Sequence, residues 1–72
     1  MCAFQDGDGL RGTEKLLGHT KTREACATLV LRLEPSANGA THSSREPNEC
    51  FAKFGAMDVG ENTAWETCIF GR

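Results

Sequence analysis

The sequence lacks several features that would each define a class of protein. No apolar run is long enough to span a bilayer, so we expect no membrane insertion. Basic residues show no surplus, because the formal net charge is -2, and this argues against a nucleic-acid partner. The four cysteines are far apart, and His19 and His42 stand alone, whereas structural zinc sites use closely spaced ligand pairs. We therefore expect no metal and no cofactor.

The chain is short for a self-supporting core. Its 72 residues are predicted to form one domain, and its fractions of 39% hydrophobic and 25% charged residues are typical of folded proteins. A domain of this size buries little surface, so disulfides commonly supply the missing stability. An even number of cysteines in so short a chain favours a disulfide framework and an oxidising compartment. We expect a secreted or extracellular-surface location, with an export leader in the native protein.

One helix is predicted within TREACATLVLRLEP. Thr22 suits the N-cap position, and Pro35 ends the helical pattern. The residues that recur at the spacing of one buried helical face are Cys26, Leu29, Val30 and Leu33.

The other regular segments are predicted to be short strands. ECFAKF alternates, which places Cys50 on one face and Phe51 and Lys53 on the other, and WETCIF alternates in the same way. TEKLLG and NGATH are weaker strand candidates, while the predicted loops are FQDGDGLRG, SSREPNE and MDVGEN. One helix among antiparallel strands predicts an α+β fold, in which a small antiparallel β-sheet is crossed by one α-helix.

The predicted faces also constrain the disulfides, for which four cysteines allow three connectivities. Cys26 is expected to point inward from the helix, and Cys50 to point inward from its strand, so a bond between them requires no change of face. The remaining pair is then Cys2 with Cys68. Loop-closure entropy gives the shorter and the longer link roughly 3.5 and 4.4 kcal/mol of stability, respectively.

The order of cysteines and elements resembles the PAN/apple family. The matching stretches are a cysteine near the start, GTEKLLG, a helix entered through TREAC, the central NECFAKF and the closing WETCIF. The resemblance implies that the outer cysteines pair and that the helix cysteine pairs with the one on the central strand. The third bridge of many apple domains has no cysteines here, because Val30 and the region 37–38 occupy its place. The resemblance therefore implies a short-form, non-catalytic extracellular module that binds proteins or sugars.

No catalytic residues are predicted. His42 stands beside Ser43 and Ser44, but a serine adjacent in sequence to its base cannot easily reach it, and no nucleophile elbow is present. The DGDG stretch begins like a calcium loop without the later ligands of that motif, so we interpret it as a solvated turn.

The surface offers the remaining clues to a ligand. Residues 11–32 carry an excess of basic residues and residues 34–66 an excess of acidic ones, which favours steered association with a charged partner. Trp65, the single tryptophan, is expected to pack in the core, and Phe51 to lie on the face away from the helix. The candidate ligand-binding residues are Arg45, Glu46, Asn48, Phe51, Lys53, Glu61 and Asn62. We expect an extracellular protein partner or, as the alternative, a glycan, and we expect the chain to be one module of a tandem or mosaic protein.

Overall fold

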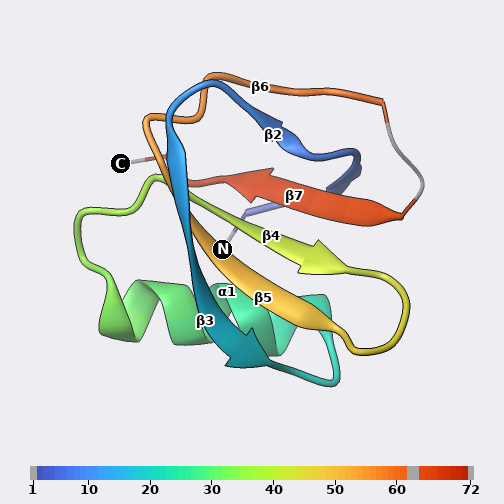
Figure 1. Cartoon of the computed structure of the whole chain (residues 1–72). Coiled ribbons are helices and arrows are strands. Elements are labelled where there is room, and N and C mark those ends of the chain that lie inside the picture. Colours follow the sequence, from blue (N-terminus) through green and yellow to red (C-terminus); the bar gives the residue numbers. More distant parts are fainter. Residues whose placement is uncertain (1, 62–63, 72) are drawn as a thin grey trace.

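The computed structural model describes residues 2–61 and 64–71. Figure 1 shows a sheet with one helix against it and a smaller, separate ribbon of two strands. The elements in chain order are β1 (Gln5–Asp6), β2 (Gly9–Leu10), β3 (Thr13–His19), α1 (Arg23–Leu33), β4 (Gly39–Ser43), β5 (Glu49–Phe54), β6 (Asp58–Val59) and β7 (Trp65–Ile69). No helix among the residues described is long and apolar enough to cross a membrane.

The main sheet has five strands in the order β1-β7-β4-β5-β3, and every neighbouring pair is antiparallel. The second sheet consists of β2 and β6 alone, also antiparallel. One helix, an antiparallel sheet and two disulfides confirm the predicted α+β fold. The predictions were wrong for β1, β2 and β6, which were assigned to loops, because strands of two residues are too short to show alternation.

Helix α1 begins where the sequence predicts. Thr22 has extended backbone angles, and its hydroxyl oxygen accepts a hydrogen bond from the Ala25 amide at 3.1 Å. This bond satisfies one of the amides that a helix leaves free at its start. The helix ends at Leu33, and the Glu34 amide donates to the Val30 carbonyl at 2.8 Å, just before Pro35.

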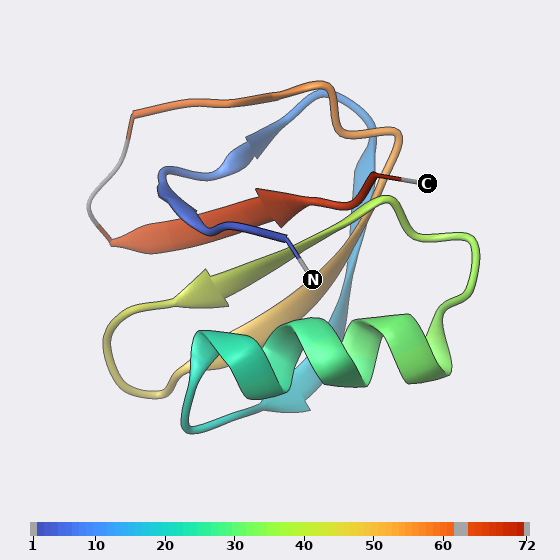
Figure 2. The ribbon, with the colours of Figure 1, turned by 180° about the vertical axis from the view of Figure 1, so that it is seen from behind.

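The buried face of α1 agrees with the predicted one at Cys26 and Val30, with Leu29 partly buried against the core, and differs at Leu33. Cys26, Ala27 and Val30 are fully buried, whereas Leu33, predicted to be buried, is 51% exposed. Ala27 packs in the same cluster as Ala40 and Ala52 of the sheet, and small side chains there let the helix backbone approach the strands closely. The helix therefore turns its alanine toward the sheet and leaves Leu33 at the rim. Figure 2 shows α1 lying across this face of the sheet.

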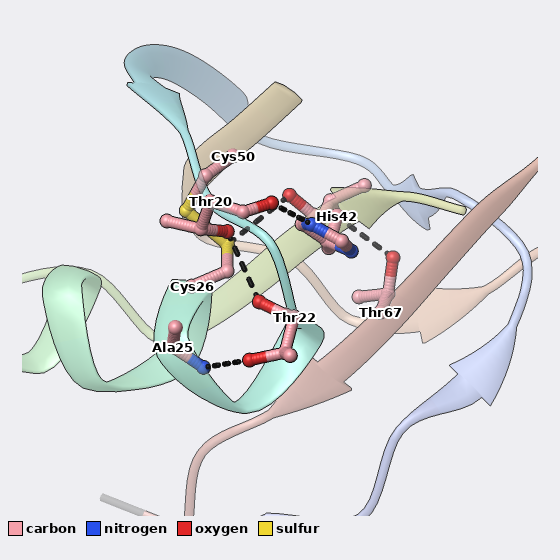
Figure 3. The surroundings of a disulfide bond; sticks show 8 residues. Thr20, Thr22, Ala25, Cys26, His42, Cys50 and Thr67 are labelled. Carbon is pink, nitrogen blue, oxygen red and sulfur yellow. Dashed lines mark hydrogen bonds between the residues drawn. A yellow bond between two sulfur atoms is a disulfide. The ribbon is translucent and has the colours of Figure 1, made fainter. Parts of the chain in front are cut away.

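Both predicted disulfides are confirmed. Cys2 is bonded to Cys68 on β7, with 5.6 Å between their Cα atoms. Cys26 of α1 is bonded to Cys50 of β5, with 5.4 Å between Cα atoms, and both residues are completely buried. Figure 3 shows this second bond between the helix and the sheet. The Cys26–Cys50 bond therefore fixes the helix to the centre of the core.

The opposite face of the sheet is partly covered by the ribbon of β2 and β6. Gly9 lies so close to the sheet that a Cβ atom added there would be 2.8 Å from Cε of Lys53 and 3.4 Å from Cγ2 of Thr67. The Thr67 hydroxyl also donates to the Gly7 carbonyl at 2.8 Å. The ribbon thus covers the sheet around Lys53 and Thr67, while Phe51 and Trp65, on the same face, remain partly exposed.

Candidate functional site

At one end of the main sheet, strands β3 and β4 end and strands β5 and β7 begin. Two loops lie there, residues 20–22 between β3 and α1 and residues 44–48 between β4 and β5. The Thr20 amide donates to the Asn48 carbonyl at 3.1 Å, which joins the two loops. Asn48 has a φ of 56°, a left-handed conformation that asparagine tolerates better than most residues, and its side-chain amide donates to the Ser43 carbonyl at 3.2 Å. Backbone bonds therefore hold both loops in place.

An open pocket of about 300 Å³ lies between these loops. Its lining residues are His19, Thr20, Lys21, Glu46, Pro47 and Asn48. Lys21 and Glu46 have opposite charges, and neither has an ion pair with any residue that the structure describes. The pocket thus offers one cation, one carboxylate and several neutral polar groups to a ligand.

A buried histidine supports the wall of this pocket. His42 on β4 is 3% exposed, and its Nε2 lies 2.9 Å from the Thr20 carbonyl, so Nε2 carries the proton and donates it. Its Nδ1 has no hydrogen-bond partner among the residues described. Figure 3 shows the ring of His42 between Thr20 and the sheet. Beside His42 in the chain, the Ser43 hydroxyl donates to the Arg45 carbonyl at 2.8 Å, which helps to hold loop 44–48.

An aromatic pair lies on the sheet face opposite α1. The ring centroids of Phe51 and Trp65 are 5.6 Å apart and the ring planes are inclined at 64°, an edge-to-face contact. Both side chains are partly buried, so the expectation of a buried tryptophan beside an exposed phenylalanine was too simple. Leu16 pairs with Phe51 across β3 and β5 and is 49% exposed. We call Leu16, Phe51 and Trp65 the aromatic strip.

The aromatic strip continues toward the pocket through Glu49 and His19. Glu49 is two residues before Phe51 on β5, so both point to the same face of the sheet. His19 is the register partner of Glu49 and also lines the pocket. The strip and the pocket therefore form one continuous surface at this end of the sheet.

The structure places the candidate residues from the sequence in different environments. Glu46 and Asn48 line the pocket, Arg45 is exposed on the same loop, and Phe51 belongs to the aromatic strip. Glu61 is exposed after β6, and Asn62 lies outside the described residues.

Lys53 is placed differently from the other candidates because it is only 4% exposed. Its ammonium lies 2.6 Å from a carboxylate oxygen of Glu14 and 3.4 Å from one of Asp8. Both carboxylates are only about half buried, so the cation is inside the protein while its partners reach solvent. Lys53 thus links β5 to β3 and to the turn that precedes β2.

Sequence reasoning missed His19, Thr20 and Lys21 because they are far from loop 44–48 in the chain. Pairing TEKLLG with ECFAKF antiparallel would have placed GHTK beside the start of β5. This strand pairing was the one sequence-based inference that could have placed these residues beside loop 44–48.

A second charged cluster lies at the start of α1. The Arg23 guanidinium forms ion pairs with Glu24 and Glu66, and its Cζ atom lies 5.6 Å from the centroid of the Phe4 ring. The hydrogen bond to Glu24, followed by the one to Glu66, raises the pKa of Arg23 above its ordinary value. The hydrogen bond from Arg23 lowers the pKa of Glu24 below its ordinary value. Arg23 thus contacts two carboxylates and one aromatic ring of the same chain.

The fold defines a small α+β domain stapled by two disulfides, with a polar pocket and an aromatic strip at one end of its sheet. No protein-family model, no curated protein and no solved structure matches this chain. A function for this chain must therefore be inferred from its fold and from this surface.

Proposed function

We propose that the chain is a non-catalytic extracellular binding module of the PAN/apple type, which contacts a protein partner at this end of the sheet. The observation that carries the proposal is the continuity of the aromatic strip with the pocket. Protein interfaces combine aromatic anchors with a polar rim, and tryptophan and arginine are enriched among the residues that dominate binding energy. Here Trp65 and Phe51 supply the anchors, and Lys21 and Glu46 supply charges at the rim.

The proposed extracellular location is supported by the disulfides. Two bonds in a domain without free cysteines among its described residues are compatible with an oxidising compartment. The Cys2–Cys68 bond also brings the two ends of the domain together, which suits a module strung with others in a tandem or mosaic protein.

The proposal is tested with the oxidised domain and a display library of extracellular protein domains. Lys21→Ala and Glu46→Gln are each expected to weaken binding to a selected partner about threefold, as the loss of a charge at the rim of an interface does. Arg32→Ala removes an exposed charge from the far end of α1 and serves as the matched control. Equal affinity for the partner in all three variants would place the interface elsewhere.

A glycan is the second candidate ligand, and one feature of the pocket supports it. Glu46, Asn48 and Thr20 line one open pocket, so a carboxylate lies near an amide and a hydroxyl, and a few polar groups of this kind can fix the orientation of a small ligand. A glycan array distinguishes the two candidates. Binding on the array that is lost in Glu46→Gln supports the lectin function, whereas silence on the array with capture of a protein supports the first proposal.

A further inference from the structure

The sheet face opposite α1 carries more negative than positive charge. Lys53 is buried there and is shared by Asp8 and Glu14, so this group of three has a net negative charge. Glu49 is on the same face and has no ion pair with any residue in the described part of the chain. The strand residues of this face include no lysine or arginine besides Lys53. The face is therefore both acidic and aromatic.

The aromatic pair is suited to hold a cation. Edge-to-face packing leaves part of each ring exposed, and the face of an aromatic ring carries partial negative charge that attracts ammonium and guanidinium groups. Glu49 is about 7 Å along the strand from Phe51 on the same side, close enough for one bound side chain to contact both residues. Phe51, Trp65 and Glu49 thus combine two attractions for the same kind of group.

The domain already uses this chemistry internally. On the other face of the sheet, Arg23 is held by the ring of Phe4 and by the carboxylates of Glu24 and Glu66. The aromatic strip and Glu49 present the same combination of groups, but none of the ion pairs or cation–ring contacts in the described part of the chain supplies them with a cation. A binding partner is the remaining source of that cation.

We infer that the aromatic strip binds an arginine or lysine side chain of an extended segment in the protein partner, with the cationic group between Phe51, Trp65 and Glu49. This inference rests on the proposed function and names the chemistry of the partner. Leu16, which is 49% exposed beside Phe51, provides apolar contact for the aliphatic part of such a side chain.

The test uses the oxidised domain and the indole N–H signal of Trp65, which NMR reports without interference because the chain has one tryptophan. The probe is a blocked Gly-Arg-Gly peptide, and its control is the same peptide with citrulline, which keeps the shape and removes the charge. The arginine peptide is expected to shift the Trp65 signal saturably at millimolar concentration, and at least about fivefold more tightly than the citrulline peptide.

Variants of the domain then identify the groups responsible. Phe51→Leu keeps an apolar side chain but removes the ring, and Glu49→Gln removes the charge; each is expected to weaken arginine binding about threefold. Asp58→Asn, an exposed charge on β6, is the matched control and is expected to change nothing. If Phe51→Leu loses the dispersed NMR spectrum of a folded domain, Glu49→Gln and the citrulline comparison still decide the question.

Equal binding of the citrulline peptide, or unchanged affinity in Glu49→Gln, would overturn the inference. The proposed function would survive that result if a protein partner still bound and Lys21→Ala still weakened it. Loss of all protein binding would instead reject the proposed function itself.

Discussion

Lys53 allows a sharp prediction about how this small domain is stabilised. Its ammonium is buried between Glu14 and Asp8, whose side chains remain 45% and 46% exposed. A buried charge whose partners are removed is strongly destabilising, whereas replacing the charge by an apolar side chain of similar volume is often close to neutral. Removing the two carboxylates and replacing Lys53 by an apolar residue are therefore expected to have very different effects on the free energy of unfolding.

The magnitudes follow from the burial of each group. Asp8→Asn combined with Glu14→Gln leaves the Lys53 ammonium without either ion pair, which costs about 3–5 kcal/mol for fully buried groups. Because both carboxylates are about half exposed, water can partly replace them, and we expect a loss of about 2–3 kcal/mol. Lys53→Met fills the same space with an apolar side chain and is expected to cost less than about 1 kcal/mol.

The assay is urea unfolding followed by the fluorescence of Trp65. With a slope of about 1 kcal/mol per molar urea for a domain of this size, the double variant shifts the midpoint down by about 2–3 M and Lys53→Met by less than about 1 M. Adding Lys53→Met to the double variant is expected to recover most of the lost stability. Equal losses in the double variant and in Lys53→Met would refute the reasoning, because they would show that Lys53 contributes packing rather than charge.

Further predictions concern the start of the helix and the disulfide core. Thr22→Ala removes the N-cap hydrogen bond and is expected to lower the free energy of unfolding by about 1 kcal/mol, while Thr22→Ser restores it. Cys26→Ala with Cys50→Ala is expected to cost at least about 3.5 kcal/mol, most of the stability of so small a domain, because it opens the loop and also empties buried space; a midpoint shift in urea below about 1 M would contradict this. Since Arg23 lowers the pKa of Glu24, the ionised carboxylate stabilises the folded state above the ordinary pKa of about 4.3, and this contribution is lost as pH falls through the lowered folded pKa. Glu24→Gln should flatten the acid side of the curve of urea midpoint against pH, and an unchanged curve would count against the ion pair.

The ends of the helix were predicted correctly, because they depend on residues that are neighbours in the sequence. The N-cap at Thr22 and the stop before Pro35 are local features, and the helix begins and ends as they predict. The inner face of α1 was only partly predicted, because periodicity gives weight to large apolar residues such as Leu33. In this domain close packing instead favours the small Ala27 against the alanines of the sheet.

The candidate site was harder to predict because it is assembled from distant segments. Phe51 and Trp65 meet only because β4 lies between β5 and β7, an order that no periodicity reveals. Lys53 alternates with Cys50 and Ala52 as predicted, but the ribbon that covers it is made of strands too short to recognise. Among the candidate ligand residues, Glu46 and Asn48 line one pocket because they lie in the same loop, residues 44–48.

The position of the Cys2–Cys68 bond also determines how the domain responds to mechanical load. Tension applied to the chain outside the two cysteines passes through the covalent bond and bypasses the 66-residue interval between them. Fully extended, and with the Cys26–Cys50 bond also broken, that interval would release about 220 Å of chain, at roughly 3.4 Å per residue. In the oxidised state it releases none of this length, even if the sheet unfolds, so the domain acts as an inextensible link. Reduction of this one bond would let the interval extend under load, except for the 24-residue loop that the Cys26–Cys50 bond still closes.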